Sequence, residues 1–350
     1  MPRFKTARIE LASISISYMR IWPGASWMQR HQIVLYLIAI VFGAVLGLQV
    51  SSVRPSLEAS INPFLGLLLY ATFLSLPLTK LLVSFRDLRF MAVLGLVNFV
   101  LVPAIVFILT RFIADDQALL YGVLLVLLAP CIDYVIVFAG IAGGDSTRLL
   151  AATPLLLLLQ VLLVPAYMFL IAGSDTLALI DPKPFLRALL GLIVVPFIAA
   201  FLTQLLMKRF AFAVRIGSWA DYLMVPLMMG TLLSVVGSQI NAVASQFQNL
   251  ATAIALFVVF VAVMAAISTA VGKLFHLETA PLRAVTFSGV TRNSLVVLPL
   301  ALALPPELSL ASAVVVSQTL VELVGMLVLI QLVPRFVTAK SGINDHKGLI

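Results

Sequence analysis

The chain has 350 residues, of which 62% are hydrophobic and only 10% are charged, and its mean hydropathy is +1.16. This is more apolar surface than the core of one water-soluble protein can bury, so the composition predicts an integral membrane protein. The formal net charge of +8 comes mainly from loops and termini, where basic residues set membrane topology. It gives no reason to expect a nucleic-acid partner.

The first 31 residues are basic and lack the long apolar stretch and small-residue cleavage site of a signal peptide. We therefore expect residues 1–31 to be a cytoplasmic N-terminal segment that lies close to the membrane surface.

Ten apolar runs follow, and each has the length of a membrane helix. A hydrocarbon core of about 30 Å requires roughly 20 apolar residues per helix. The runs are continuously apolar rather than alternating, which predicts helices and argues against the strands of a β-barrel. The runs cover residues 32–49, 61–79, 90–110, 119–142, 149–172, 185–207, 219–237, 249–272, 281–304 and 308–333.

Basic residues are distributed unequally between the two sides of this topology. Of the 22 lysines and arginines, seventeen fall on the side that carries both termini, four fall on the opposite side, and Arg292 lies inside a run. Because cytoplasmic loops are enriched in basic residues, both termini are predicted to be cytoplasmic. We expect a multi-pass protein of the cell (plasma) membrane.

The second half of the chain resembles a copy of the first. A shift of 162 residues overlays the first five runs on the last five and places Cys131 on Asn293 and Gln160 on Glu322. Because each half has an odd number of helices, the halves are inserted in opposite orientations, as in many secondary transporters. The predicted fold is an all-α integral membrane protein with ten transmembrane helices in two inverted five-helix repeats. Its predicted parts are the cytoplasmic N-terminal segment at 1–31, the first repeat at 32–172, a linker at 173–184, the second repeat at 185–333 and a cytoplasmic tail at 334–350.

The fourth and ninth runs are interrupted near their centres. The interruptions read Ala129-Pro130-Cys131-Ile132-Asp133 and Ser288-Gly289-Val290-Thr291-Arg292-Asn293-Ser294. Proline removes a backbone donor and glycine adds flexibility, so Pro130 and Gly289 are the predicted helix breaks. We expect helices four and nine to cross there and to offer unpaired peptide groups to a ligand.

Three charged residues lie at membrane depth, where each costs about 2.5–3.5 kcal/mol or more. They are Asp133, Arg292 and Glu322. One interpretation is structural: Asp133 and Arg292 form an ion pair between the broken helices, and Glu322 is held as a neutral acid beside Gln318. The other interpretation is functional, with a coupling proton or cation carried by Asp133 or Glu322, assisted by Gln318.

Cys131 is the single cysteine of the chain. Buried cysteine often packs as a small hydrophobic side chain, but a thiol beside a helix break is also a soft ligand for a thiophilic solute. The Gly43/Gly47 spacing predicts close helix packing, and Asp145, at a loop edge, is expected to be a helix cap or a solvated charge. No histidine lies at membrane depth to activate Cys131, so an intramembrane enzyme is disfavoured. The sequence has neither a zinc-ligand cluster nor a nucleotide-binding motif, and we predict no metal and no cofactor.

The ten runs and the segments LAPCIDYVIVFAGIAGGD and FSGVTRNSLVVLPLALALP resemble the arsenical-resistance branch of the bile acid/sodium symporter superfamily. The resemblance covers residues 32–333, and Ala129-Pro130-Cys131 is its most specific element. It implies a panel domain, a core domain with two crossing broken helices, and export of arsenite, for some members also antimonite, generally in exchange for protons. Where this family usually has two asparagines and a glutamate in the ninth helix, the chain has Arg292, Asn293 and Leu295. The missing acid makes Asp133 a candidate substitute.

The resemblance and the residue chemistry together predict the binding site. Cys131 is expected to contact the metalloid transiently through sulfur, while Thr291, Asn293 and Ser294 hydrogen-bond its hydroxyl groups. Transport is expected by alternating access, with helices four, five, nine and ten moving against the rest.

An alternative keeps the fold and changes the cargo to an organic anion imported with sodium. Arg292 would then pair with the anion, while Glu322 and Gln318 would hold sodium. The predicted partners are the small-molecule substrate, protons or sodium as the coupling ion, and membrane lipid. The sequence makes no prediction of oligomeric state.

Overall fold

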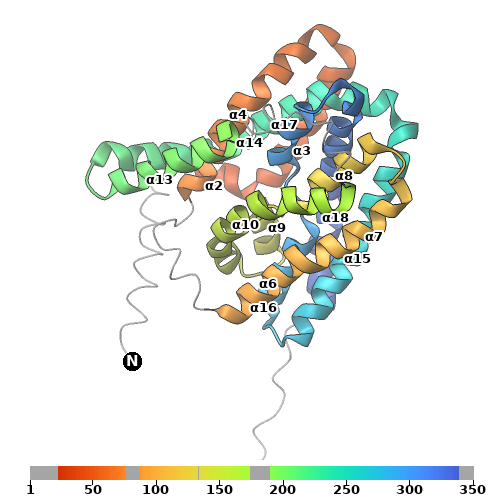
Figure 1. The fold of residues 1–350 in the computed structure, drawn as a ribbon. Coiled ribbons are helices and arrows are strands. Elements are labelled where there is room, and N and C mark those ends of the chain that lie inside the picture. Colours follow the sequence, from red (N-terminus) through yellow and green to blue (C-terminus); the bar gives the residue numbers. More distant parts are fainter. Residues whose placement is uncertain (1–22, 76–86, 133, 174–189, 339–350) are drawn as a thin grey trace, which may run out of the picture. The chain divides into compact units, whose positions relative to one another are not determined.

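The computed structural model describes residues 23–75, 87–132, 134–173 and 190–338 (Figure 1). These residues form helices joined by turns, and within them the pairing of extended backbone is limited to one isolated bridge. Seven helices in the described ranges are long and apolar enough to cross a membrane, and α8 and α13 are shorter apolar helices. The all-helical prediction is confirmed for these ranges, and the helices have the character of an integral membrane protein.

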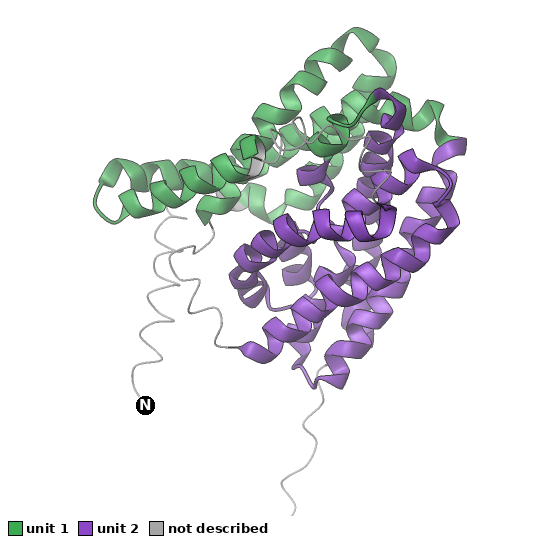
Figure 2. Cartoon of the chain, viewed as in Figure 1, with its two compact units in different colours: residues 1–79, 181–247, 298–305 green, residues 80–180, 248–297, 306–350 purple. Residues whose placement is uncertain are grey.

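The chain divides into two compact units (Figure 2). Unit 1 comprises residues 1–79, 181–247 and 298–305, and unit 2 comprises residues 80–180, 248–297 and 306–350. Each unit therefore takes segments from both halves of the sequence. The predicted repeats at 32–172 and 185–333 are consequently divided between the two units.

Unit 1 is built from long apolar helices. Its helices are α2 (Pro23–Arg30), α3 (Gln32–Gln49), α4 (Arg54–Ser75), α13 (Val195–Met207) and α14 (Ala211–Ser245), with a 3-10 turn η1 at Ser51–Val53 and a π-helical turn η5 at Leu190–Val194. α4 begins before the predicted run 61–79, and α14 extends beyond the run 219–237 at both ends, because helical hydrogen bonding continues through polar residues next to the apolar stretch.

Glycines bring α3 and α14 close together within unit 1. Gly43 lies against the backbone of Leu233, and a Cβ atom on Gly47 would collide with the carbonyl oxygen of Gly237. Small residues one turn apart permit this close approach of two helix backbones, and the resulting van der Waals contacts help membrane helices to associate. The close packing expected from the Gly43/Gly47 spacing is confirmed.

Unit 2 contains the shorter helices that surround the interrupted segments. Its helices are α6 (Leu88–Leu96), α7 (Val102–Thr110), α8 (Gln117–Leu128), α9 (Val135–Ile141), α10 (Ser146–Ala172), α15 (Phe247–Leu274), α16 (Thr279–Val290) and α18 (Leu310–Phe336), together with the π-helical turn η3 (Val97–Leu101) and the 3-10 turns η4 (Arg111–Ile113) and η6 (Pro306–Leu308). α17 (Ser294–Leu302) begins in unit 2 and ends in unit 1.

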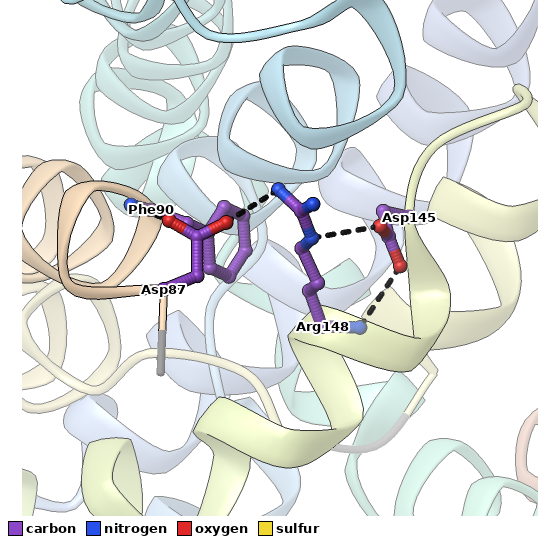
Figure 3. A network of polar contacts seen from close by, with 4 residues as sticks. All are labelled: Asp87, Phe90, Asp145 and Arg148. Atoms are coloured by element: carbon purple, nitrogen blue, oxygen red, sulfur yellow. Dashed lines mark hydrogen bonds and ion pairs between the residues drawn. The ribbon is translucent and has the colours of Figure 1, made fainter. Parts of the chain in front are cut away.

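Two helices of unit 2 begin at aspartates that are bridged by one arginine (Figure 3). The side chains of Asp87 and Asp145 cap α6 and α10 by accepting hydrogen bonds from the backbone N–H groups of Phe90 and Arg148. The guanidinium of Arg148 lies 2.6 Å from Asp87 and 3.1 Å from Asp145. Caps typically stabilise by about 1 kcal/mol, and such half-exposed ion pairs by less. Asp145 is therefore a helix cap, one of the two roles expected for it.

Candidate functional site

The site is formed where two unwound segments of unit 2 meet. α8 ends at Leu128 and α16 ends at Val290, and in both cases the C-cap residue has extended backbone. Beyond these ends, Pro130 and Arg292 form an antiparallel bridge. The interrupted parts of helices four and nine therefore pair through their backbones.

Two backbone hydrogen bonds join the segments. The N–H of Cys131 donates to the carbonyl of Thr291 at 3.2 Å, and the N–H of Asn293 donates to the carbonyl of Ala129 at 2.8 Å. Adding 162 to the residue number of Cys131 gives Asn293, and subtracting 162 from that of Thr291 gives Ala129, so the two bonds join equivalent positions of the two predicted repeats in exchanged roles. The pairing thus has the local two-fold relation that two equivalent segments crossing antiparallel would produce.

Arg292 is fully buried beside this crossing. Its guanidinium donates to the carbonyl oxygens of Leu127 and Ser288 and to Oδ1 of Asn98, the last at 2.9 Å. The ring of Phe260 lies 5.7 Å from the guanidinium carbon. Its Nε atom has no hydrogen-bond partner among the described residues. Within the described structure the guanidinium is therefore hydrogen-bonded to backbone and amide oxygens.

Glu322, on α18, is the buried acid of the site. Its Oε1 accepts a hydrogen bond of 2.6 Å from the hydroxyl of Tyr134, and its Oε2 accepts from the backbone N–H of Arg292 at 2.7 Å and from the side-chain amide of Gln318. Three donors converge on two oxygens, the pattern that suits a carboxylate acting as acceptor only. Glu322 thereby fixes the backbone of the ninth helix at its interruption.

The predicted substrate-binding residues lie together but differ in their contacts. Cys131 and Asn293 belong to the paired segments, and Ser294 begins α17. The side-chain amide nitrogen of Asn293 has no hydrogen-bond partner within the described ranges. The hydroxyl of Thr291 donates to Phe287, so it completes the end of α16. The amide of Asn293 and the hydroxyl of Ser294 are consequently buried groups that remain available to a ligand within the described structure.

One predicted break is displaced. Gly289 is the penultimate residue of α16, and the helix ends after Val290. A Cβ atom at Gly289 would collide with Ser268 of α15 and crowd Val97. Glycine is therefore needed there for close packing, whereas the interruption begins at Thr291. Pro130 lies within the unwound segment, where its lack of a backbone N–H leaves no helical hydrogen bond unmade.

Asp133 lies outside the described residues. The predicted ion pair between Asp133 and Arg292 therefore stays a prediction.

Sequence reasoning missed Asn98 and Tyr134. Asn98 is fully buried and donates to Leu94 and Ser288 while accepting from Arg292. It is the single amide in the predicted run 90–110, and a lone amide at membrane depth is a signal for such a role. Tyr134 follows Asp133 directly, and nothing in its spacing indicated that it reaches Glu322.

Part of the chain is similar to a known transporter family. Residues 62–220 match the model of the Sodium Bile acid symporter family, whose members are transporters rather than enzymes. The matched segment is less than half of the chain. It includes Cys131 and ends before Arg292 and Glu322. The match supports the superfamily that the sequence resembles, without selecting a branch. No curated protein matches the chain.

Proposed function

We propose that the protein is a secondary transporter that exports arsenite from the cell in exchange for protons, with antimonite as a further candidate cargo. The observation that carries this proposal is the position of Cys131, the single thiol of the chain, in the paired segment at the crossing. The similarity to a symporter family supports membrane transport, and the resemblance of the Ala129-Pro130-Cys131 segment to arsenical-resistance proteins supports the cargo.

The chemistry of the site suits a small uncharged trihydroxide. Thiolate sulfur binds soft metalloids, and the amide of Asn293 and the hydroxyl of Ser294 can hydrogen-bond hydroxyl groups. A single thiol gives weak binding, so the cargo is released on the far side, whereas several thiols would retain it. The division into two compact units is what supports transport by alternating access, in which one body moves against another.

The coupling proton is proposed to bind at Asp133 or Glu322. For Glu322, protonation would remove an acceptor from the cluster of Tyr134, Gln318 and the Arg292 backbone. Losing that acceptor would weaken the hold on the ninth helix, which gives a physical route from proton binding to helix movement.

The competing function is import of an organic anion together with sodium. The buried Arg292 favours it in principle, because a guanidinium pairs well with carboxylates. Its terminal nitrogens, however, already donate to Leu127, Ser288 and Asn98. An anion would have to replace these contacts, so metalloid export is the better-supported proposal.

Transport into inside-out vesicles tests cargo and coupling together. Arsenite and an organic anion such as taurocholate are compared under imposed proton and sodium gradients. The expected result is arsenite uptake that is driven by a proton gradient with the acidic side in the vesicle lumen. Sodium-dependent movement of the anion, with no arsenite uptake, would replace the proposal by its competitor.

The role of Cys131 is tested by Cys131→Ser, which keeps size and polarity but removes the soft ligand. We expect arsenite transport to fall roughly tenfold or more with normal membrane insertion. Thr110→Ser is the control, since Thr110 is also fully buried and its hydroxyl bonds only carbonyls of its own helix. In the unmodified protein, arsenite should slow labelling of the single thiol by a maleimide. Unchanged transport by Cys131→Ser would reduce Cys131 to a packing residue.

A further inference from the structure

The guanidinium of Arg292 lies among oxygens at the C-terminal ends of two helices. Its donors reach the carbonyls of Leu127, in the last turn of α8, and Ser288, in the last turn of α16. Asn98 adds a side-chain oxygen at 2.9 Å. Helix C-termini carry partial negative charge, so these three oxygens form a cluster that attracts a cation.

Both carbonyls have lost their normal helical donors. Leu127 would accept from the N–H of Cys131, which donates to Thr291 instead, and Ser288 would accept from the N–H of Arg292, which donates to Glu322. The interruptions thus leave two carbonyls, at the same place, without a backbone donor among the described residues. Exposed carbonyls at broken helix ends are the groups that coordinate sodium in secondary transporters.

We propose that the side chain of Arg292 is a built-in cation that occupies a position suited to a monovalent ion, which makes the protein independent of sodium at this site. This inference deepens the proposed transport function. Only its consequence, that transport needs no sodium at this site, rests on the proposed function. The oxygens present are hard ligands of the kind that sodium accepts. A sodium ion entering beside the guanidinium would be repelled by its like charge, and this repulsion is strong where little water screens it. The arginine therefore excludes the ion.

The test replaces Arg292 and asks whether sodium takes its place. Purified protein is melted in sodium chloride, potassium chloride and choline chloride at equal ionic strength, without cargo. For Arg292→Ala we expect a saturable, sodium-specific rise in Tm of at least about 2 °C, because bound sodium stabilises only the folded state. The unmodified protein and Arg292→Lys should melt alike in all three salts.

Arg283→Ala is the matched control. Arg283 also donates to backbone carbonyls near helix ends, at Ala142, Pro334 and Val337, but it is half-buried and water can replace it. No sodium-specific change is expected for this variant.

Several outcomes would overturn the inference. Sodium-specific stabilisation of the unmodified protein would show that Arg292 does not exclude the ion. Equal melting of Arg292→Ala in every salt, or failure of that variant to fold even in sodium, would show that the oxygens cannot accept sodium in place of the guanidinium. A sodium response of Arg283→Ala would make the effect unspecific. Because the assay contains no arsenite, failure of metalloid transport would leave its result unaffected.

Discussion

At the scale of single residues, the acid and the base of the site satisfy their charges differently. Glu322 accepts three hydrogen bonds, whereas the terminal nitrogens of Arg292 donate to backbone and amide oxygens. An isolated buried charge costs several kcal/mol, so each set of contacts lowers the cost of burying its group inside the protein. In the described structure Glu322 and Arg292 are joined by a hydrogen bond from the backbone N–H of Arg292 to the carboxylate of Glu322.

Tyr134 offers a direct measurement of this network. Tyr134→Phe removes the hydroxyl that lies 2.6 Å from Glu322 and leaves the ring in place. We expect a loss of about 1.5–3 kcal/mol in stability, since the lost hydrogen bond involves a buried acid. Thermal melting of the purified protein measures the change.

The control is Tyr70→Phe, where the hydroxyl contacts the hydroxyl of Thr203 at 2.9 Å in a half-buried position. It should cost about 1 kcal/mol or less. Equal losses for both tyrosines would mean that Glu322 gains nothing special from Tyr134.

The sequence singled out most of the polar residues that lie together at the crossing, but not their contacts. Arg292, Glu322, Gln318 and Cys131 were recognisable because polar side chains at membrane depth are costly. Which groups meet depends on side chains from other helices, such as Asn98, and on where each helix stops. Neither can be read from spacing along one run.

At the scale of elements, interrupted helices were predictable and their limits were not. Proline is unfavourable inside a helix, and α8 ends at Leu128, two residues before Pro130. In the ninth run, glycine suggested a break at Gly289, but α16 continues to Val290, and this glycine instead makes room for Ser268 and Val97. A glycine can mark either flexibility or close approach, and only the packing partner distinguishes the two.

The packing of α3 on α14 provides a second prediction. Gly47→Ala places a methyl group into the carbonyl oxygen of Gly237, a backbone atom that cannot move without separating the helices. We expect a loss of about 1–3 kcal/mol, as for other overpacked sites, seen as a lower Tm and lower folded yield.

Gly66→Ala in α4 is the matched control, since a Cβ atom there meets no other atom within 4 Å. Alanine in a helix interior should leave stability unchanged or raise it by about 0.5–1 kcal/mol. If Gly47→Ala behaved in the same way, α3 and α14 would not depend on this close contact.

At the scale of the whole molecule, the helix bounds repeat along the chain. Adding 162 to the bounds of α8 (Gln117–Leu128) gives those of α16 (Thr279–Val290), and the same shift places α10 within two residues of α18. Weak sequence identity therefore accompanies a close repetition of element lengths. This regularity supports the proposal of two repeats, while their opposite orientation in the membrane stays a prediction.

Topology in the membrane is the corresponding whole-molecule prediction. Because seventeen of the 22 basic residues fall on the side of the termini, both ends should be cytoplasmic. A green fluorescent protein fused after Ile350 should fluoresce in a bacterial host, and alkaline phosphatase fused there should be inactive. The same reporters fused after residue 51, beyond the first run, should give the opposite pattern. Active phosphatase at Ile350 would contradict the predicted orientation.

The two backbone hydrogen bonds at the crossing also allow its opening to be measured. The amide hydrogens of Cys131 and Asn293 are each held by the opposite segment, so separation of the segments releases both at once. Hydrogen–deuterium exchange should therefore give these two amides similar protection, limited by a single opening event. Their shared exchange rate would report how often the crossing opens. Rates that differ by more than about tenfold, or about 1.4 kcal/mol in opening free energy, would mean that one of the two segments opens without the other.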